Sequence, residues 1–332
     1  MKPELSIIVP AYNAASFLES CLAAILQAPG PEREIIVVDD ASQDDSSKTA
    51  SAFGVRVIRN DRNLGCAESR NIGAREARSP ILIFIDADCV IHHDALNRID
   101  SFFAKNQSYA ALFGSYDSTP ECRTFISQYR NLLHHLTHQN ARRDAETFWT
   151  GLGAVRRTNF ERLGGFRQDC GMEDVLLGIQ LNESGCRVAI DKNLLCKHLK
   201  CWSFINMIRT DIFLRAQPWS QIALSRRHFA NDLNTSVSNR IGVLSSGISV
   251  VLMPLAFLNS TFAYALILFL AINIASNAHV LSGFMRLRGP FFAMRAIPAH
   301  FVHQLCAGLG LCLALLESMR GNRFSYVESS TE

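Results

Sequence analysis

Two aspartates of this chain, Asp86 and Asp88, are spaced to hold a metal ion together with a phosphate group. They directly follow residues 81–85, an apolar run between polar turns that predicts a buried strand. Side chains two residues apart in an extended chain point to the same side, so both carboxylates are expected to leave the sheet edge together. Carboxylates at the carboxyl end of a parallel strand suit a hard divalent cation with bound phosphate oxygens. Alone, the pair also fits a surface turn capped by acids.

A second acidic pair, Glu173 and Asp174, opens a predicted amphipathic helix. By itself, an acid in the first helical turn indicates a favourable interaction with the helix dipole. The region before this helix is rich in glycine, which permits close backbone approach or a mobile loop. These glycines are Gly151, Gly153, Gly164 and Gly165.

Strands and helices alternate through the first part of the chain. Apolar runs at residues 5–9, 34–38 and 55–58 predict strands, with helices between them. Pro10 is expected to end the first strand because it lacks a backbone donor. Alternation that continues to Asp86 predicts a parallel sheet with helical crossovers. No G-x-G-x-x-G motif follows the first strand, which argues against a dehydrogenase.

Three more elements are predicted before the glycine-rich region: a helix over residues 94–106, a strand over 113–117 and a helix over 123–145. The last helix contains His134 and His138 one turn apart, a spacing that two metal ligands on a helix can have. No acidic or cysteine partner lies nearby in the sequence. We therefore expect this helix face to border a substrate cleft or a membrane.

Composition restricts the class of protein and its compartment. The 332 residues carry a formal charge of +3 with scattered basic residues, which argues against nucleic acid binding. Ten cysteines occur without a C-x-x-C pair, so reduced and mostly buried thiols are expected. No secretory signal is found before the first strand, and residues 1–225 are therefore expected in the cytoplasm.

Four motifs in order give the first 90 residues a resemblance to a known family. They are SIIVPAYNA, EIIVVDDASQD, NLGCAESRNIGA and the DAD strand end. This order resembles the inverting glycosyltransferases of family 2. The similarity continues in TGLGAVRRTNFERLGGF and GMEDVLLGIQL, to about residue 220. The resemblance implies a GT-A fold, which is a Rossmann-like α/β fold with a mostly parallel sheet and helices on both faces.

The resemblance also implies a donor site for a nucleotide sugar, with a UDP-sugar as the first expectation. Its residues would be Pro10, Tyr12, Asp40, Arg70 and Asp86. Pro10 and Tyr12 would line the nucleobase pocket. Asp40 would accept a hydrogen bond from the base, and Arg70 would lie near the nucleotide.

A divalent cation, Mn²⁺ or Mg²⁺, is the implied cofactor. Asp88 would bind it, and Asp86 would reach the same metal or the ribose. His198 either completes the metal site, as in some family members, or is a structural histidine. The cation would neutralise the charge that develops on the leaving nucleoside diphosphate.

The same resemblance assigns the catalytic and acceptor residues. Asp174 would be the general base that takes the proton from an acceptor hydroxyl, and Glu173 would support it. The region with Gly151, Gly153 and Gly171 would receive the acceptor and the sugar.

Two departures from the family pattern limit what is carried over. Gln180 stands where this helix often has arginine, so no role of that arginine is transferred. The Q-x-x-R-W signature of processive polymer synthases is missing, and LRAQPW stands nearest to it. We therefore expect transfer of a single sugar.

The C-terminal part predicts a transmembrane region at about residues 240–320. Residues 241–285 and 296–316 contain no Asp, Glu, Lys or Arg. Since about 20 apolar residues cross a bilayer, two to three spans are expected, and the third segment either crosses the bilayer or is re-entrant or interfacial. The expected spans are residues 241–258, 262–284 and 297–316.

Charged residues near these spans predict their orientation. Residues 201–224 mix apolar and charged side chains and are expected to lie as a helix in the membrane interface. By the positive-inside rule, Arg240 and the loop from Arg286 to Arg295 face the cytoplasm.

Together these patterns predict an integral membrane protein with a cytoplasmic catalytic domain at residues 1–225. It would transfer one sugar, with inversion and metal assistance, to an acceptor hydroxyl, as in cell-envelope glycan synthesis. The acceptor is expected to be lipid-linked because the domain is tethered to a bilayer. A polyprenyl-phosphate acceptor, already ionised and needing no base, is the alternative within this class.

Two hypotheses from other classes are less well supported. A non-catalytic membrane scaffold that keeps the nucleotide-sugar fold does not require intact Asp86, Asp88 and Asp174. A nucleotidyltransferase would be expected to have a glycine-rich and basic triphosphate loop after the first strand, and PAYNAASFL is not such a loop.

Overall fold

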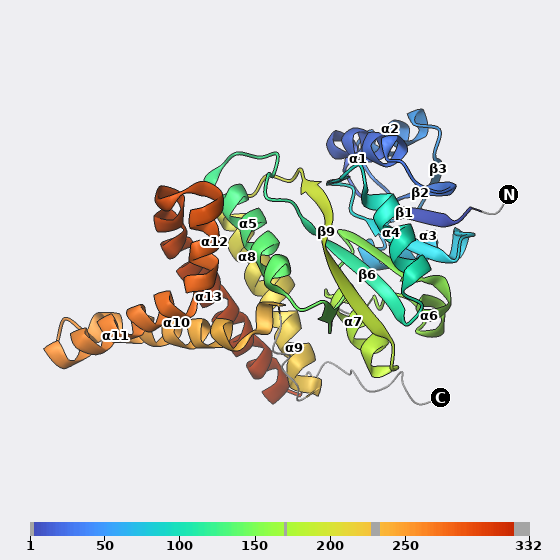
Figure 1. Cartoon of the computed structure of the whole chain (residues 1–332). Helices are drawn as coiled ribbons and strands as arrows, with labels where there is room; N and C mark the ends of the chain where they lie inside the picture. Colours follow the sequence, from blue (N-terminus) through green and yellow to red (C-terminus); the bar gives the residue numbers. More distant parts are fainter. Residues whose placement is uncertain (1–2, 169–170, 227–232, 322–332) are drawn as a thin grey trace. The chain divides into compact units, whose positions relative to one another are not determined.

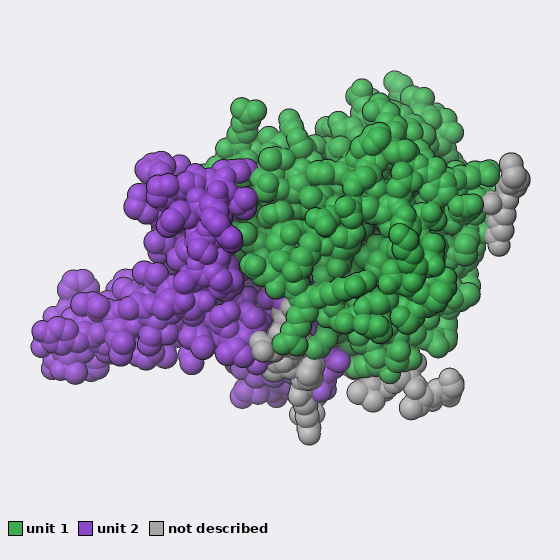
Figure 2. All heavy atoms as spheres, in the orientation of Figure 1, with its two compact units in different colours: residues 1–201 green, residues 202–332 purple. Residues whose placement is uncertain are grey.

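The computed structural model describes residues 3–168, 171–226 and 233–321 (Figure 1). Its contacts divide the chain into two compact units, residues 1–201 and 202–332 (Figure 2). The first unit therefore ends before the segment 204–226, which was expected to belong to the catalytic domain. The reason is that the helices of this segment pack against the last helix of the second unit.

The first unit is built on one mixed β-sheet. Its strands are β1 (Leu5–Ala11), β2 (Arg33–Asp39), β3 (Arg56–Arg59), β4 (Ile81–Ile85), β5 (Cys89–Ile91), β6 (Tyr109–Tyr116), β7 (Asp144–Ala145), β8 (Leu152–Arg156) and β9 (Arg187–His198). Their order is β3-β2-β1-β4-β8-β6-β9-β5, and β7 pairs with β9. Strands β3, β2, β1 and β4 are parallel, whereas β8 pairs antiparallel with β4 and β6. The expected α/β class is confirmed, with parallel pairing concentrated in the N-terminal half.

Helices cover both faces of the parallel half. They are α1 (Ala15–Gln27), α2 (Ser46–Ala52), α3 (Cys66–Glu76) and α4 (Ala95–Lys105). Successive residues of β1 explain the arrangement, because Ile7 and Val9 lie in one core with α1 and α4. Ile8 points to the other face, where its side chain lies 2.5 Å from the position of a Cβ on Gly73 of α3. Burial on both faces accounts for the continuous apolar runs of β1 and β4.

Pro10 does not end the first strand, contrary to the sequence-based expectation. Strand β1 continues to Ala11, and both residues pair with β2. Pairing with β4 stops at Ile8, so the missing N–H of Pro10 lies beyond that ladder. Pro10 is also buried, so of the two residues expected at the nucleobase only Tyr12 presents an exposed surface.

Three helices follow in the second half of the first unit. They are α5 (Phe125–Asn140), α6 (Arg157–Arg162) and α7 (Glu173–Glu183). The side chain of Thr124 caps α5 by accepting a hydrogen bond from Ser127 N. Helix α5 ends before residue 145, the expected end, because residues 144–145 pair with β9 as strand β7. Helix α7 begins at the acidic pair, as expected.

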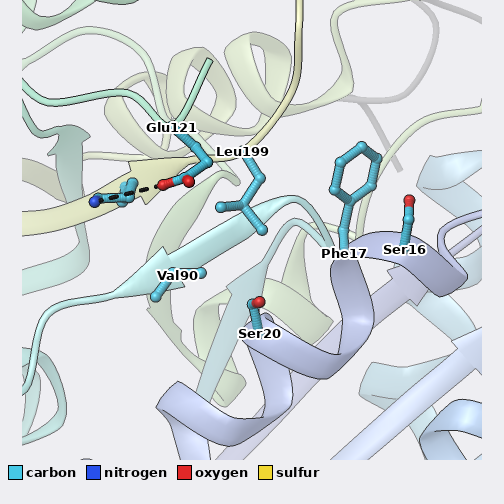
Figure 3. A pocket seen from close by; sticks show the side chains of 7 residues that line it. Ser16, Phe17, Ser20, Val90, Glu121 and Leu199 are labelled. Carbon is cyan, nitrogen blue, oxygen red and sulfur yellow. Dashed lines mark ion pairs between the residues drawn. The ribbon is translucent and has the colours of Figure 1, made fainter. Parts of the chain in front are cut away.

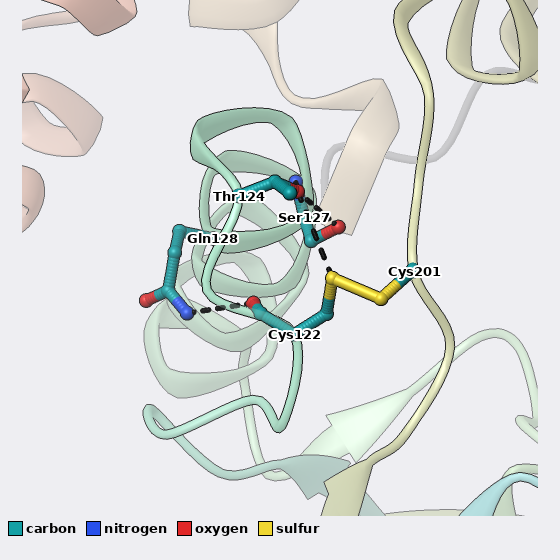
Figure 4. The surroundings of a disulfide bond; sticks show 5 residues. All are labelled: Cys122, Thr124, Ser127, Gln128 and Cys201. Atoms are coloured by element: carbon teal, nitrogen blue, oxygen red, sulfur yellow. Dashed lines mark hydrogen bonds between the residues drawn. A yellow bond between two sulfur atoms is a disulfide. The ribbon is translucent and has the colours of Figure 1, made fainter.

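A disulfide joins Cys122, in the loop before α5, to Cys201, just beyond β9 (Figure 4). The expectation of reduced thiols is therefore wrong for these two residues. They are 79 positions apart in sequence, and only the folded chain brings their Cα atoms to 5.3 Å. The neighbouring backbone is hydrogen-bonded as well, since Glu121 N donates to His198 O. The other cysteines in the described ranges are free thiols.

Breaking this cross-link is expected to destabilise the first unit. A disulfide that closes a loop of 79 residues lowers the conformational entropy of the unfolded chain. For a loop of this length, the resulting gain in the free energy of unfolding is about 4 kcal/mol. The double variant C122S/C201S should lose about that much free energy of unfolding, measured by denaturant titration of the detergent-solubilised protein. Dithiothreitol should bring the wild type to the same value and leave the variant unchanged. A wild type that dithiothreitol does not destabilise would contradict this prediction.

The second unit is helical. Its elements are α8 (Phe204–Arg209), the π-helix η1 (Thr210–Ala216), α9 (Gln217–Arg226), the 3₁₀ turn η2 (Leu233–Thr235), α10 (Val237–Leu255), α11 (Ser260–Ser276), α12 (Ala278–Arg288) and α13 (Pro290–Met319). Within the described residues, α10 and α13 are long and apolar enough to cross a membrane. Helices α11 and α12 meet this criterion only as a pair bent by 60°. The segment expected as one span at residues 262–284 is therefore a broken span or a re-entrant pair.

Polar side chains are buried where these apolar helices meet. Asn273 of α11 donates to the carbonyl of Gly242 on α10 (2.9 Å) and to Oε1 of Gln304 on α13 (2.7 Å). Asn277, at the break between α11 and α12, accepts from Gln304 Nε2 and lies 2.9 Å from His300 Nε2. Hydrogen bonds of this kind hold helices together where water is absent. The bend between α11 and α12 thus coincides with a polar junction of three helices.

Candidate functional site

The two aspartates after β4 point to different partners. Asp86 Oδ1 lies 2.6 Å from Arg70 Nη2, whereas Asp88 Oδ2 lies 3.5 Å from His198 Nε2. Both residues belong to the turn between β4 and β5, so the side-chain alternation of an extended strand does not apply to them. The two carboxylates therefore have different partners, while their common exit from the sheet edge stays a prediction.

Arg70 connects the two acidic pairs. It lies on α3 and is almost fully buried. Its Nη2 donates to Asp86 and its Nη1 donates to Glu173, each over 2.6 Å. The sequence suggests a place near the nucleotide for Arg70. The structure adds that its guanidinium joins the turn after β4 to the first residue of α7.

Helix α3 also holds the loop that leads to α7, a role that the motifs do not reveal. The Asn71 side chain accepts from Phe166 N (2.9 Å) and donates to Phe166 O (2.8 Å). Gly165 permits this contact, because its φ is +82° and a Cβ there would lie 2.7 Å from Asn71 Oδ1. One helix thus positions both acidic pairs.

Replacing Arg70 by methionine is expected to destabilise the protein by about 3–5 kcal/mol. The variant leaves two partly buried carboxylates, Asp86 and Glu173, without the buried cation that they share. Arg75→Met is the matched control, because Arg75 forms an exposed ion pair on the same helix, which is worth about 0–1 kcal/mol. Denaturant titration of the full chain in detergent measures both. Equal losses for the two variants would contradict the bridging role.

Asp174 is the acid of the second pair that is free to act on a ligand. Its Oδ1 accepts a hydrogen bond from Val175 N (2.8 Å), and in the described part of the chain it has no ion-pair partner, whereas Glu173 is bound by Arg70. Burial, followed by the charge of Glu173, raises the pKa of Asp174 from 3.8 to about 6. A carboxylate with this pKa is ionised at neutral pH and is a stronger base than an ordinary aspartate.

Asp88 and His198 are the residues best placed to hold a cation. Although burial opposes the shift, the hydrogen bond and charge of His198 lower the pKa of Asp88. Burial raises the pKa of Asp86, which remains bound to Arg70. Among the residues described, no three His, Cys, Asp or Glu side chains can hold a metal by themselves. The site therefore fits a cation that takes its other ligands from substrate phosphates, as Mg²⁺ usually does.

The residues expected at the nucleobase lie where β1 and β2 end. Tyr12 follows β1 and is 49% exposed, so its ring is open to a ligand. Asp40 is buried, and its carboxylate accepts hydrogen bonds from Leu64 N, Gly65 N and Asn60 Nδ2, each over 2.8 Å. Asp40 thus holds the loop before α3, a task that the sequence does not reveal.

The glycines expected near the acceptor make room for Trp149. A Cβ on Gly151 would lie 2.1 Å from the Trp149 indole, and one on Gly153 would lie 2.3 Å from the Trp149 carbonyl oxygen. Gly151 O also accepts from Asp86 N (3.4 Å), which brings this loop to the aspartate turn. Gly171 is exposed and lies two residues before the start of α7. The sequence marks these glycines but not the tryptophan.

Trp149 belongs to an aromatic cluster that joins distant segments. Its ring centroid lies 4.9 Å from that of Tyr116 and 4.8 Å from that of His134. Tyr116 stacks on His198 at 4.3 Å, and His134 lies 4.1 Å from His138. The histidine face of α5 therefore packs in this cluster, which ends at the histidine beside Asp88.

Comparison with known proteins identifies the first unit. Residues 6–164 match the family described as Glycosyl transferase family 2. These residues form a family 2 glycosyltransferase domain. The resemblance carried by the four motifs is confirmed, and the match ends before α7 with its Glu173–Asp174 pair.

Curated relatives resemble the family 2 domain over short segments. An uncharacterized glycosyltransferase of Haemophilus influenzae is 44% identical over 85 residues, which cover 25% of this chain and 29% of that protein. The uncharacterized glycosyltransferase EpsJ of Bacillus subtilis is 31% identical over 131 residues, or 38% of each chain. The matches thus span well under two thirds of these relatives.

Two solved structures share the fold. The mannosyltransferase PcManGT from Pyrobaculum calidifontis, in complex with GDP-Man and Mn²⁺, has a TM-score of 0.58 at 19% identity and covers 97% of this chain and 89% of its own. S. aureus TarS 1–349 in complex with UDP-GlcNAc has a TM-score of 0.51 at 14% identity and covers 98% and 95%. At these identities the likeness establishes the GT-A fold alone.

Proposed function

We propose that this chain transfers a single sugar from a nucleotide sugar to an acceptor hydroxyl, with inversion at the anomeric carbon. The observation that carries the proposal is the Arg70 bridge, because it brings the start of α7, and with it Asp174, to the aspartate turn. The family 2 domain supports the donor class. Two structural neighbours were solved with nucleotide sugars, GDP-Man and UDP-GlcNAc.

In the proposed reaction Asp174 takes the proton of the acceptor hydroxyl while that oxygen bonds to the anomeric carbon. The bond from this carbon to the diphosphate oxygen breaks on the opposite face, and its electron pair leaves with the nucleoside diphosphate. Asp88 and His198 would hold Mn²⁺ or Mg²⁺, which would stabilise the charge on the leaving diphosphate. Arg70 binds the carboxylates of both Glu173 and Asp86, so Glu173 would support the site and Asp174 would act as the base.

UDP is the nucleotide that we propose for the donor. The exposed ring of Tyr12 can stack on a pyrimidine. Each carboxylate oxygen of Asp40 has two lone pairs, and Oδ2 accepts one hydrogen bond within the described part of the chain. Asp40 can therefore hold the loop before α3 and still accept the N–H of uracil.

A lipid-linked acceptor and a cytoplasmic catalytic domain complete the proposal. Helices α10 and α13 support membrane attachment. Exposed apolar side chains before them, including Ile205 and Phe213, support an interfacial position of α8 and η1. The Cys122–Cys201 disulfide argues for an oxidising compartment instead. Labelling of Glu19→Cys by an impermeant maleimide in intact cells, compared with the wild type, decides between the two sides, since only an external domain would react more than the wild type.

Calorimetric binding of UDP, GDP and dTDP to the detergent-solubilised chain, with and without Mn²⁺, tests the proposal. Metal-dependent binding of UDP is the expected result. Metal-dependent binding of GDP or dTDP alone would keep the reaction class and replace the proposed donor. If folded protein binds none of the three, the transfer proposal fails and the scaffold hypothesis takes its place.

A further inference from the structure

A pocket of about 410 Å³ opens on the first unit between the start of α1, strand β5 and the end of β9 (Figure 3). This volume falls within the range of ~300–1,000 Å³ that is typical of small-molecule sites. None of its lining residues belongs to the donor, metal or base residues described above. The reaction proposed above therefore uses none of the residues that line this pocket.

One side of the pocket is apolar. It consists of the half-buried ring of Phe17 on α1 and the side chains of Val90 on β5 and Leu199 beyond β9. Figure 3 shows Phe17 rising from α1 and Leu199 entering from the segment after β9. An aromatic ring beside two aliphatic side chains can hold the flat apolar face of a small ligand.

The other lining residues carry groups that form hydrogen bonds. Ser16 and Ser20 lie one helical turn apart on α1, so both face the pocket from the same side. Lys197 Nζ lies 3.7 Å from Glu121 Oε2, which is an ion pair but too long for a hydrogen bond. Within the described residues, none of these four side chains makes a hydrogen bond to protein. Their donors and acceptors remain available to a ligand.

The pocket adjoins the residue proposed to bind the cation. Leu199 N donates to Asp88 O over 2.9 Å, and Val90 follows Asp88 by two residues. A ligand in the pocket would therefore lie next to the aspartate turn, on the side of α1 and β5.

The disulfide holds two walls of this pocket together. Glu121 directly precedes Cys122, and Leu199 comes shortly before Cys201. The bond thus ties the loop that carries Glu121 to the segment that carries Leu199. A fixed arrangement of these walls lowers the entropy lost when a ligand binds.

We propose that this pocket is a carbohydrate subsite that binds a pyranose ring of the acceptor. The inference rests on the proposed function and adds the chemical class of the acceptor. A pyranose presents an apolar C–H face to Phe17 and a rim of hydroxyls that can both donate and accept. A free phosphate would meet the carboxylate of Glu121, and an acyl chain would desolvate the Glu121–Lys197 ion pair.

Saturation-transfer NMR on the full chain in detergent tests this subsite. The probes are the methyl glycosides of glucose, N-acetylglucosamine, galactose and mannose. The variant is Ser20→Trp, which fills the pocket from the exposed face of α1. Glu19→Trp is the matched control, because Glu19 is exposed on the same helix and does not line the pocket.

We expect at least one glycoside to give a saturable signal that Ser20→Trp removes and Glu19→Trp retains. A signal that persists in Ser20→Trp, or the absence of any signal with folded wild type, would overturn the subsite. Calorimetry of UDP with Mn²⁺ on the same samples separates this result from the proposed function. A folded wild type that binds UDP with Mn²⁺ but gives no glycoside signal refutes only the subsite. A folded wild type that binds none of the tested nucleotides refutes the transfer proposal.

Discussion

Asp174→Asn is expected to lower the rate of sugar transfer by about 10²–10⁴-fold, the usual contribution of a general base. The amide keeps the shape of the side chain but cannot take the hydroxyl proton. Metal-dependent nucleotide binding should survive, because Asp88 and His198 lie on other elements. Steady-state transfer assays and nucleotide calorimetry on the same preparation measure the two effects separately.

The raised pKa of Asp174 predicts how the activity and the stability of the wild type depend on pH. For the wild type, kcat/KM should rise with pH through about 6, because only the ionised carboxylate accepts a proton. The pKa of Asp174 is raised from 3.8 to about 6 in the folded protein, so binding of a proton to Asp174 stabilises the fold. This stabilisation is complete below about pH 4 and is lost as the pH rises through about 6. At neutral pH the ionised carboxylate therefore costs stability. Asp174→Asn should accordingly be more stable than the wild type by about 1–3 kcal/mol.

Glu183→Gln is the matched control for Asp174→Asn, since Glu183 is an exposed acid at the other end of α7. It should leave both the transfer rate and the pH profile unchanged. Wild-type turnover by Asp174→Asn would show that the base assignment is wrong. In that case an acceptor that is already ionised, such as a polyprenyl phosphate, would become the favoured hypothesis.

Asp88→Ala should remove metal-dependent nucleotide binding. Asp88 is the carboxylate that Arg70 leaves free, and its lowered pKa keeps it ionised for a cation. Changing a residue that merely supports a metal ligand commonly costs about 10–100-fold in affinity, so loss of a ligand should cost at least as much. Titration of Mn²⁺ and UDP by calorimetry, with and without the other ligand, measures the effect.

Asp94→Ala serves as the control for this substitution, because Asp94 is an exposed acid a few residues further along the chain. It should bind Mn²⁺ and UDP as the wild type does. Circular dichroism confirms that Asp88→Ala is folded before its binding is compared. If folded Asp88→Ala kept wild-type affinity for UDP with Mn²⁺, Asp88 would not be a metal ligand.

The local part of this architecture was predictable from residue patterns. Apolar runs and turn residues locate β1, β2 and β4, and the acidic pair locates the start of α7. These features depend on neighbours within a few residues, so periodicity and turn chemistry are sufficient to find them. Pro10 is an instructive exception, because its effect on β1 depends on where pairing with β4 ends.

Long-range pairing was not predictable in this way. The bridge from Arg70 to Glu173 joins residues 103 positions apart, and no local pattern distinguishes it from a solvated helix charge. The same holds for Trp149, whose place becomes clear only from the glycines that admit its ring. The break between α11 and α12 at Asn277 has no local signal either, because uncharged residues surround it and its hydrogen-bond partners lie on α13.

For this chain, residue order alone settled the strand–helix alternation of the first 90 residues, the family resemblance and the apolar C-terminal segments. Those properties are encoded by neighbouring residues. The partners of Asp86 and Asp88, the raised pKa of Asp174, the Cys122–Cys201 bond and the pocket beside α1 were decided by tertiary structure. Each depends on burial or on contacts between segments brought together by the sheet, and neither quantity can be read from spacing along the chain.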